Sequence, residues 1–370
     1  MNYLYNFFFS IPGFCYILIW ILVFFATILT KKKIFDHLGS ISILLFSFVF
    51  LGCRDEFSGT DTYRYVQYFN NITSFFDGTK EPGYGLFTII LKFFGNWQFF
   101  LVANVLVQLF ILYLICVFLE LRVKSVVLLF YISMMPGFDM LTNGLRQGLA
   151  ISFGMLVWTL AFYKNYVPKI FFCSVLLFHK SMLSFIPAVI FGNVKNNRFS
   201  NILFKYLVWV FLIFILFYEI FGNYLGFEKY FQYLSFDLLG STQTVDQRLE
   251  TIFLSNTQIL VGYFKYYFLL LVLFFIVFIS MHRKYVHNNP ALLNLVKTFN
   301  FLAMLYAVMW ISPHSYRFMY LCFLPGTVVV FILLKLINRR DYYGIIMFLI
   351  LISSILVYSS NTFKNFTFNL

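Results

Sequence analysis

Long apolar runs recur along the whole 370-residue chain, and they restrict its fold more than any other feature. A run of about 20 apolar residues spans the hydrocarbon core of a bilayer as one α-helix. Helices suit that environment because every backbone polar group inside a bilayer must find its partner within the protein. Hydrophobic residues make up 61% of the chain, and its mean hydropathy is +0.84, which excludes a soluble globular protein. The sequence therefore predicts an all-α, polytopic integral membrane protein.

We expect about ten of these runs to cross the membrane. Their approximate bounds are 11–29, 38–53, 97–119, 125–138, 146–163, 206–221, 259–281, 298–311, 319–336 and 342–358. Residues 86–94 form a run that is too short to cross, which predicts a helix lying in the membrane interface. The expected fold is therefore about ten transmembrane helices plus one or two re-entrant or interfacial partial helices, all within one integral domain, 1–370.

The run at 170–192 differs from the others because basic residues flank it on both sides, with Lys164 and Lys169 before it and Lys195 after it. A single crossing would place one of these flanks outside, although basic residues favour the cytosolic side. Two half-helices that meet at His179 would keep both flanks cytosolic and place the histidine at an outward-facing apex. Non-helical backbone at that depth is tolerated where it lines a polar cavity. We therefore expect the broken, re-entrant form.

The distribution of charge sets the orientation. The net charge is +13, and most basic residues fall in short turns on one side of the predicted spans, beginning with Lys31, Lys32 and Lys33. Most acidic residues fall on the other side. Because basic residues favour cytosolic loops, the charge reflects topology and predicts no nucleic-acid partner. The segments expected outside the cytosol are 54–85, 139–146, 222–256 and 312–317.

The chain shows no metal or redox motif. Its five cysteines lie in or beside apolar runs without metal-ligand spacing, and their odd number gives no disulfide framework. The chain also lacks the glycine-rich phosphate loop and the GxSxG, HExxH and paired CxxC motifs. ATP hydrolysis, serine hydrolysis and zinc chemistry therefore find no support, and we expect no cofactor.

The segment 54–84 concentrates charge in a chain in which only 11% of residues are charged. A solvated loop at a membrane boundary is the usual explanation of such a cluster. Here two turns, Gly59-Thr60-Asp61 and Glu81-Pro82-Gly83-Tyr84, fix the backbone around single acidic groups. We therefore interpret the segment, which begins at Arg54, as half of a polar site that faces water outside the cytosol.

Arg146 opens an apolar span, where its positive charge opposes the dipole of the helix. It therefore needs an anionic partner, either a carboxylate or a ligand, unless it is an interfacial arginine that snorkels to water. Arginines beside a helix N-terminus can bind phosphate or pyrophosphate, because guanidinium matches phosphate oxygens in bidentate fashion. The other polar residues of interest on the predicted outer face are Arg54, Asp61, Glu81, Asn143, Gln147, His179, Arg248 and Arg317.

Three of these residues could handle a proton. Asp61 and Glu81 could accept a proton from a sugar hydroxyl or hydrogen-bond to it. His179 lies in an apolar run, where a histidine is usually a hydrogen-bonded core residue. Its position beside Lys180 and Ser181, at the expected helix break, makes a functional role an equal alternative.

Four short motifs follow one another in this part of the chain. They are Arg54 with Gly59-Thr60-Asp61 and Tyr65, then Glu81-Pro82-Gly83-Tyr84, then residues 143–150 (NGLRQGLA), and finally His179-Lys180-Ser181. Together they resemble the signatures of the EpsG family of Wzy-type polysaccharide polymerases. The resemblance covers residues 54–181 and continues weakly to Arg317.

This resemblance implies a glycosyltransferase of the bacterial inner (plasma) membrane with its active site facing the periplasm or outside. Such an enzyme would transfer a growing glycan from one undecaprenyl-pyrophosphate carrier to another carrier-linked oligosaccharide repeat unit, forming O-antigen, capsule or exopolysaccharide. The resemblance also implies a metal-independent reaction and a GT-C-like helical architecture. Besides the lipid bilayer, it suggests a flippase and a chain-length regulator as partners.

The resemblance also assigns roles to the candidate residues. Asp61, Glu81 or His179 would orient or deprotonate the acceptor hydroxyl. Negative charge accumulates on the leaving pyrophosphate, which cationic side chains can stabilise. Arg54, Arg146 and Arg317 would act there, and Asn143, Gln147 and Arg248 complete the expected substrate-binding set.

Two alternatives remain open at this stage. Another polyprenyl-linked glycosyltransferase or an O-antigen ligase would share the lipid-linked donor and differ in the acceptor. A flippase or transporter of the lipid-linked oligosaccharide belongs to another class and should carry ionisable residues near the bilayer midplane. In the predicted topology nearly all such residues fall at one face, which favours an enzyme.

Overall fold

The computed structural model describes residues 11–29, 33–58, 61–74, 81–193, 198–221, 257–310 and 315–359. All the secondary-structure elements within these ranges are helices, as the predicted all-α class requires. Contacts within the chain define two compact units. Unit 1 comprises Met1–His179 and Leu334–Leu370, and unit 2 comprises Lys180–Leu333. The expected single integral domain, 1–370, remains a prediction.

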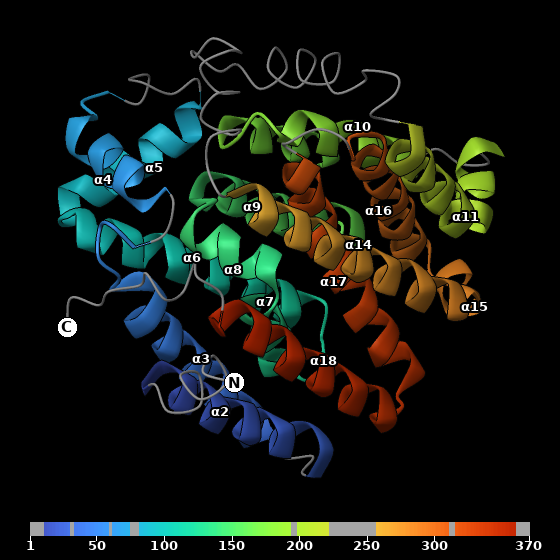
Figure 1. The fold of residues 1–370 in the computed structure, drawn as a ribbon, viewed down its shortest axis with the longest axis horizontal. Coiled ribbons are helices and arrows are strands. Elements are labelled where there is room, and N and C mark those ends of the chain that lie inside the picture. The colour runs from blue at the N-terminus through green and yellow to red at the C-terminus, as the bar shows by residue number, and fades with distance from the viewer. Residues whose placement is uncertain are drawn as a thin grey trace. The chain divides into compact units, whose positions relative to one another are not determined.

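Unit 1 contains the N-terminal helices and the last helix (Figure 1). In chain order its elements are α2 (Ile11–Phe24), the π-helix η1 (Phe25–Leu29), α3 (Lys33–Ser47), the π-helix η2 (Phe48–Gly52), α4 (Thr62–Asn71), α5 (Pro82–Phe94), α6 (Trp97–Phe118), α7 (Lys124–Ser133), α8 (Met135–Thr142), α9 (Leu145–Trp158), the π-helix η3 (Thr159–Tyr163), the 3₁₀-helix η4 (Lys169–Leu177) and α18 (Arg340–Ser359). Helix α6 is central to this unit because it contacts α5, α7, α9 and η2. Its N-terminus is capped by Asn96, whose side chain accepts a hydrogen bond from the amide of Phe99 at 3.0 Å.

Unit 2 contains the remaining described helices. They are α10 (Met182–Asn193), α11 (Arg198–Phe221), α14 (Thr257–Met281), α15 (Arg283–His287), α16 (Pro290–Val308) and α17 (Ser315–Ile337), which belongs to unit 2 as far as Leu333. Helix α16 contacts α10 and α11 along its length. Asn289 caps its N-terminus by accepting a hydrogen bond from the amide of Leu292 at 3.0 Å, and Pro290 occupies its first position.

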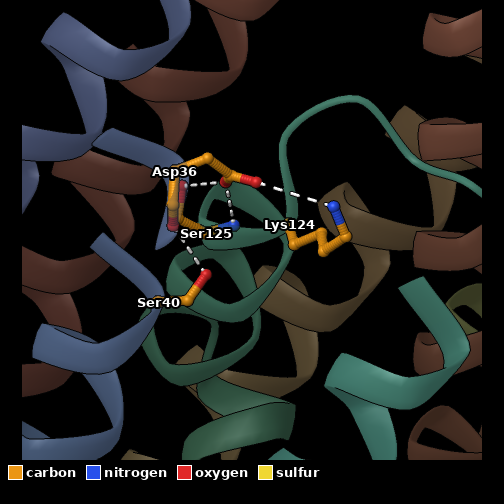
Figure 2. A network of polar contacts seen from close by, with 4 residues as sticks. All are labelled: Asp36, Ser40, Lys124 and Ser125. Atoms are coloured by element: carbon orange, nitrogen blue, oxygen red, sulfur yellow. Dashed lines mark hydrogen bonds and ion pairs between the residues drawn. The ribbon is translucent and has the colours of Figure 1, made fainter. Parts of the chain in front are cut away.

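A carboxylate from α3 caps helix α7 in unit 1. Asp36 Oδ1 accepts hydrogen bonds from the amide of Ser125 at 2.8 Å and from its hydroxyl at 2.7 Å. Lys124 Nζ lies 3.8 Å from the other carboxylate oxygen, and Ser40 donates to the backbone carbonyl of Asp36 at 2.8 Å. Figure 2 shows these four residues between the two helices. The free amides at the start of α7, which has no side-chain cap of its own, are therefore satisfied by a buried acid from a neighbouring helix.

Helices in the described part of the chain confirm a multi-pass membrane protein. Six of them are long and apolar enough to cross a membrane, or seven if the bent pair α7 and α8 counts as one span. Shorter apolar helices occupy Ile11–Thr27, Pro82–Phe94, Met182–Gly192, Tyr206–Phe221 and Lys265–Met281. The expected count of about ten crossings stays a prediction.

The run predicted to cross at 125–138 is broken into two helices, and its crossing stays a prediction. The two helices are α7 and α8, which meet at Met134 with a bend of 78°. Pro136 lies at the start of α8 and cannot continue the hydrogen bonding of α7, so a new helix begins there. The second helix runs on to Thr142, and the expected outer segment 139–146 consists largely of helix ends.

The described part of the segment 54–85 is also largely helical. It contains α4, which buries Thr62, Val66 and Phe69 on one face, and it reaches the first turn of α5. Lys297 directly precedes the span predicted at 298–311, which would place it in a cytosolic turn, and this placement is wrong. It lies within α16, 7% exposed, since the Asn289 cap starts that helix well before residue 298.

The run at 170–192 breaks where the sequence predicted. Its first half is the 3₁₀-helix η4 and its second half is α10, with Phe178, His179, Lys180 and Ser181 between them. The re-entrant path of the two halves remains a prediction.

Candidate functional site

An ion pair between the starts of α5 and α9 forms the centre of the candidate site. Arg146 is the second residue of α9, and its Nη1 lies 3.0 Å from Glu81 Oε2. Glu81 directly precedes Pro82, the first residue of α5. The arginine therefore has the carboxylate partner that a positive charge at a helix N-terminus needs. The Glu81 side chain is 6% exposed and that of Arg146 is 36% exposed, so part of the arginine side chain remains accessible.

The other oxygen of Glu81 faces His179. Glu81 Oε1 lies 3.7 Å from His179 Nε2, and the histidine side chain is 13% exposed. Gly83 permits this approach, because a Cβ at that position would lie 2.9 Å from both the Cβ and the carbonyl oxygen of Leu177. The glycine of the Glu81-Pro82-Gly83-Tyr84 motif thus brings the first turn of α5 against the segment that leads into His179.

Helix α4 contributes Tyr65 to the same cluster. The central carbon of the Arg146 guanidinium lies 6.0 Å from the centre of the Tyr65 ring. Burial raises the pKa of the Tyr65 phenol, which keeps the hydroxyl protonated at neutral pH. Tyr65 therefore meets Arg146 as a neutral group, and Glu81 supplies the negative charge.

The turn between α8 and α9 contains two more predicted residues. Asn143 Nδ2 donates to Asp139 Oδ1 at 2.7 Å, and the amides of Asn143 and Gly144 both donate to the backbone carbonyl of Asp139. Asn143 is 6% exposed and Gln147 is 5% exposed. Asn143 thus shapes the turn that precedes Arg146, and Gln147 lies inside the helix packing.

Arg54 is fully buried at the end of η2. Its Nε donates to Thr62 Oγ1 at 3.1 Å, its Nη1 to the carbonyl of Leu51, and its Nη2 to the carbonyl of Thr142 at 2.8 Å. The sequence predicted a ligand for pyrophosphate here. In the structure, all three side-chain nitrogens bind the protein itself.

The remaining predicted residues have other partners or lie outside the described chain. Asp61 precedes α4 and accepts from Arg64 at 3.3 Å, with side chains 42% and 75% exposed. Arg317 belongs to unit 2, in the first turn of α17, where its Nε donates to the phenol of Tyr316 at 3.4 Å. Arg248 lies outside the described residues.

The cluster of Glu81, Arg146 and His179 combines three chemical capacities. The exposed part of Arg146, at a helix N-terminus, can bind an anion. A histidine beside a carboxylate can hold or move a proton. The carboxylate fixes both neighbours, because each of its oxygens faces one of them.

Comparison with protein families gives this cluster a context. The model of the EpsG family matches residues 39–369, nearly the whole chain. The chain belongs to the EpsG family. This confirms the resemblance drawn from the four motifs. No curated protein and no solved structure matches the chain. The EpsG family is associated with polysaccharide polymerase, or glycosyltransferase-like, activity.

The structure adds two residues, Tyr65 and Gln108, that sequence reasoning did not assign to the site. Tyr65 was noted only as part of a motif, and its contact with Arg146 depends on helix α4. Gln108 is a buried residue of α6 that hydrogen-bonds the carbonyl of Met140 at 3.3 Å. The sequence did contain a signal for Gln108, because a single polar residue inside an apolar span often has a functional or structural partner.

Proposed function

We propose that this EpsG-family protein is a Wzy-type polysaccharide polymerase. It joins undecaprenyl-pyrophosphate-linked oligosaccharide repeat units at the outer face of the bacterial inner membrane. The observation that carries the proposal is that Glu81, Arg146 and His179, which come from three separate motifs, form one cluster. Family membership supports the general reaction, because the family is associated with polysaccharide polymerisation.

The reaction transfers the growing glycan from its own carrier to a carrier-linked repeat unit. The hydroxyl oxygen of the acceptor sugar forms a bond to the anomeric carbon of the donor glycan, and the bond from that carbon to the pyrophosphate oxygen breaks. The hydroxyl proton passes to a base. Undecaprenyl pyrophosphate leaves with one more negative charge than it carried in the donor.

Arg146 stabilises the charge that develops on the leaving pyrophosphate. Its guanidinium offers five N–H donors, of which the bond to Glu81 uses only a part. The N-terminus of α9 adds a favourable potential for an anion at the same place. Donors fixed in advance where charge develops are among the largest contributions to catalysis.

His179 accepts the proton, and Glu81 orients the histidine. Glu81 Oε2 is already engaged by the Arg146 guanidinium at 3.0 Å. Its other oxygen faces His179 Nε2, as a carboxylate does when it fixes the ring of a histidine base. Asp61, which is partly exposed at the start of α4, contacts the acceptor sugar in this scheme.

The test is to delete the gene from its host and to separate the surface glycan on a gel. Wild type and the Arg146→Ala, His179→Gln and Arg122→Ala variants are then reintroduced, with protein levels in the membrane measured in parallel. Arg122 is the matched control, because it is an exposed arginine whose Nη1 bonds only Asn338 Oδ1 in the described structure.

The expected result is that deletion reduces the ladder of polymer to single repeat units. Wild type and Arg122→Ala should restore the ladder, whereas Arg146→Ala should not. For His179→Gln, loss of a general base should lower polymer formation by about 10²- to 10⁴-fold. Full-length polymer in the deletion strain would overturn the proposal. A complete loss of surface glycan, with lipid-linked units accumulating inside, would favour a flippase instead.

A further inference from the structure

Arg54 presents an electrostatic problem that the proposed reaction does not use. It is 0% exposed, and no carboxylate in the described ranges forms an ion pair with it. Charged side chains are seldom fully buried unless they are paired, because removing a charge from water is costly. Burial lowers the pKa of the Arg54 guanidinium to about 10, so the group is still charged at neutral pH.

Two helix ends compensate this charge. Leu51 lies in the last turn of η2 and Thr142 is the last residue of α8, and the carbonyls of both accept hydrogen bonds from Arg54. Carbonyls at a helix C-terminus lack intrahelical partners and carry partial negative charge. Gln98 satisfies the next carbonyl of η2, because its Nε2 donates a hydrogen bond to the carbonyl oxygen of Gly52 at 2.9 Å. One guanidinium therefore caps the C-termini of two helices at once.

Arg54 reaches the candidate site through the turn between α8 and α9. Thr142, which it holds, is four residues before Arg146. Gln108 supports the same turn from α6, donating to the carbonyls of Met140 at 3.3 Å and Leu145 at 3.5 Å. The turn that precedes Arg146 is thus fixed by two buried side chains from other segments, Arg54 and Gln108.

A second connection runs through α4. Arg54 Nε donates to Thr62 Oγ1, and Thr62 is the first residue of that helix and is itself fully buried. Tyr65, one turn further along, places its ring 6.0 Å from the Arg146 guanidinium. Displacement of Arg54 would therefore release both the backbone before Arg146 and the tyrosine that contacts it.

We propose that Arg54 is a positioning residue, which fixes the α8–α9 turn and the start of α4 so that Arg146 and Tyr65 keep their places. It does not touch the substrate, and this role replaces the pyrophosphate contact expected from the sequence. The consequence for turnover rests on the proposed function, whereas the structural role of Arg54 does not.

The first test measures backbone hydrogen exchange of the purified protein in nanodiscs. Arg54→Lys keeps the charge but cannot span two carbonyls with a planar fork. Thr62→Val is a milder second variant of similar size, in case Arg54→Lys fails to fold. Loss of one hydrogen bond from a charged group should speed exchange by about tenfold or more at 139–148 and 61–66.

Hydrogen exchange in α18 should stay unchanged in both variants. The control variant Arg122→Lys should leave exchange at 139–148 and at 61–66 unchanged. Unchanged exchange at 139–148 in both Arg54→Lys and Thr62→Val would overturn the proposal. This measurement needs no substrate, so its outcome is independent of whether the protein polymerises glycan.

The second test is a double-mutant cycle on turnover per folded molecule. Arg54→Lys, Arg146→Lys and the double variant are compared with wild type, using lipid-linked repeat units as substrate. If Arg54 acts through Arg146, its replacement should lower turnover about tenfold or more in wild type and much less in the Arg146→Lys background. Equal fold-losses in both backgrounds would show independent contact with substrate and overturn the assignment. If wild type itself forms no polymer, the proposed function fails and the exchange result still stands.

Discussion

Arg146 and Glu81, which are 65 positions apart in the chain, form an ion pair with Nη1 and Oε2 separated by 3.0 Å. The pair joins the N-termini of α9 and α5, so each helix contributes one charge to a common point. The acid suits its position at the start of a helix, whereas the arginine opposes the dipole of α9 and is stabilised by the acid. This arrangement leaves part of the Arg146 side chain exposed.

Glu81→Gln should weaken both the fold and the activity. The amide keeps the shape of the side chain but leaves Arg146 without a negative partner, which should cost about 1–3 kcal/mol of stability. Turnover of lipid-linked repeat units should fall by about 10²-fold, because His179 also loses its orienting group. Thermal unfolding in nanodiscs and single-step transfer assays measure the two effects. Glu81→Asp is the control, since it keeps the charge and should retain more stability. Wild-type turnover in Glu81→Gln would contradict the role of the pair.

Gly83→Ala should disturb the approach of α5 to the segment before His179. The new Cβ would lie 2.9 Å from the carbonyl oxygen of Leu177, and backbone at that distance has to shift. Overpacking of this kind should destabilise the protein by about 1–3 kcal/mol and reduce polymer length. Gly39→Ala in α3 is the control, because the three atoms nearest to its Cβ would all belong to side chains and lie no closer than 3.0 Å. Equal loss of stability in the two variants would argue against a special contact at Gly83.

Asp36→Ala should lower stability without changing the chemistry of the site. It removes the acceptor for the amide and hydroxyl of Ser125 at the start of α7 (Figure 2). Loss of a helix cap costs about 0.5–2 kcal/mol, which a lower melting temperature should report. Ser40→Ala, which removes only a hydroxyl bonded within its own helix, should have a much smaller effect. Turnover per folded molecule should equal that of wild type, and an unchanged melting temperature in Asp36→Ala would refute the capping role.

Glu120 should give unit 1 a small, pH-dependent contribution to stability. Its carboxylate accepts a hydrogen bond from Lys164 at 2.8 Å and lies 3.5 Å from Lys335 Nζ. The hydrogen bond and the positive charge of Lys164 lower the pKa of Glu120 below its ordinary value. Because the folded-state pKa is depressed, the contribution is present above the unfolded-state pKa and is lost as pH falls through the folded value.

The melting temperatures of wild type and Glu120→Gln measure this contribution. They should differ at about pH 7 and converge as pH falls below the folded-state pKa, where the carboxylate is protonated in both states. The difference at neutral pH should also shrink at about 1 M salt, because the group is exposed. A difference that persists at low pH would assign the effect to shape and not to charge.

Local sequence patterns were sufficient for part of this description. The length and composition of the apolar runs predicted a helical membrane protein, and the helix break near His179 was visible in the basic residues on either side of it. The helix dipole argument predicted that Arg146 needs an anion, and Glu81 is that anion in the structure. The bend at Met134 was missed, since hydropathy reports the length of an apolar run and is insensitive to its direction.

The sequence by itself determined the membrane environment, the helical class and the identity of the residues that carry charge. These follow from local properties, because transfer of each residue into lipid depends mainly on that residue and its near neighbours along the helix. Only the tertiary structure decided which charges meet. It paired Glu81 with Arg146 and His179, and it buried Arg54 against two helix ends. Such contacts join positions far apart in the chain, and they depend on how the helices pack, which no local pattern specifies.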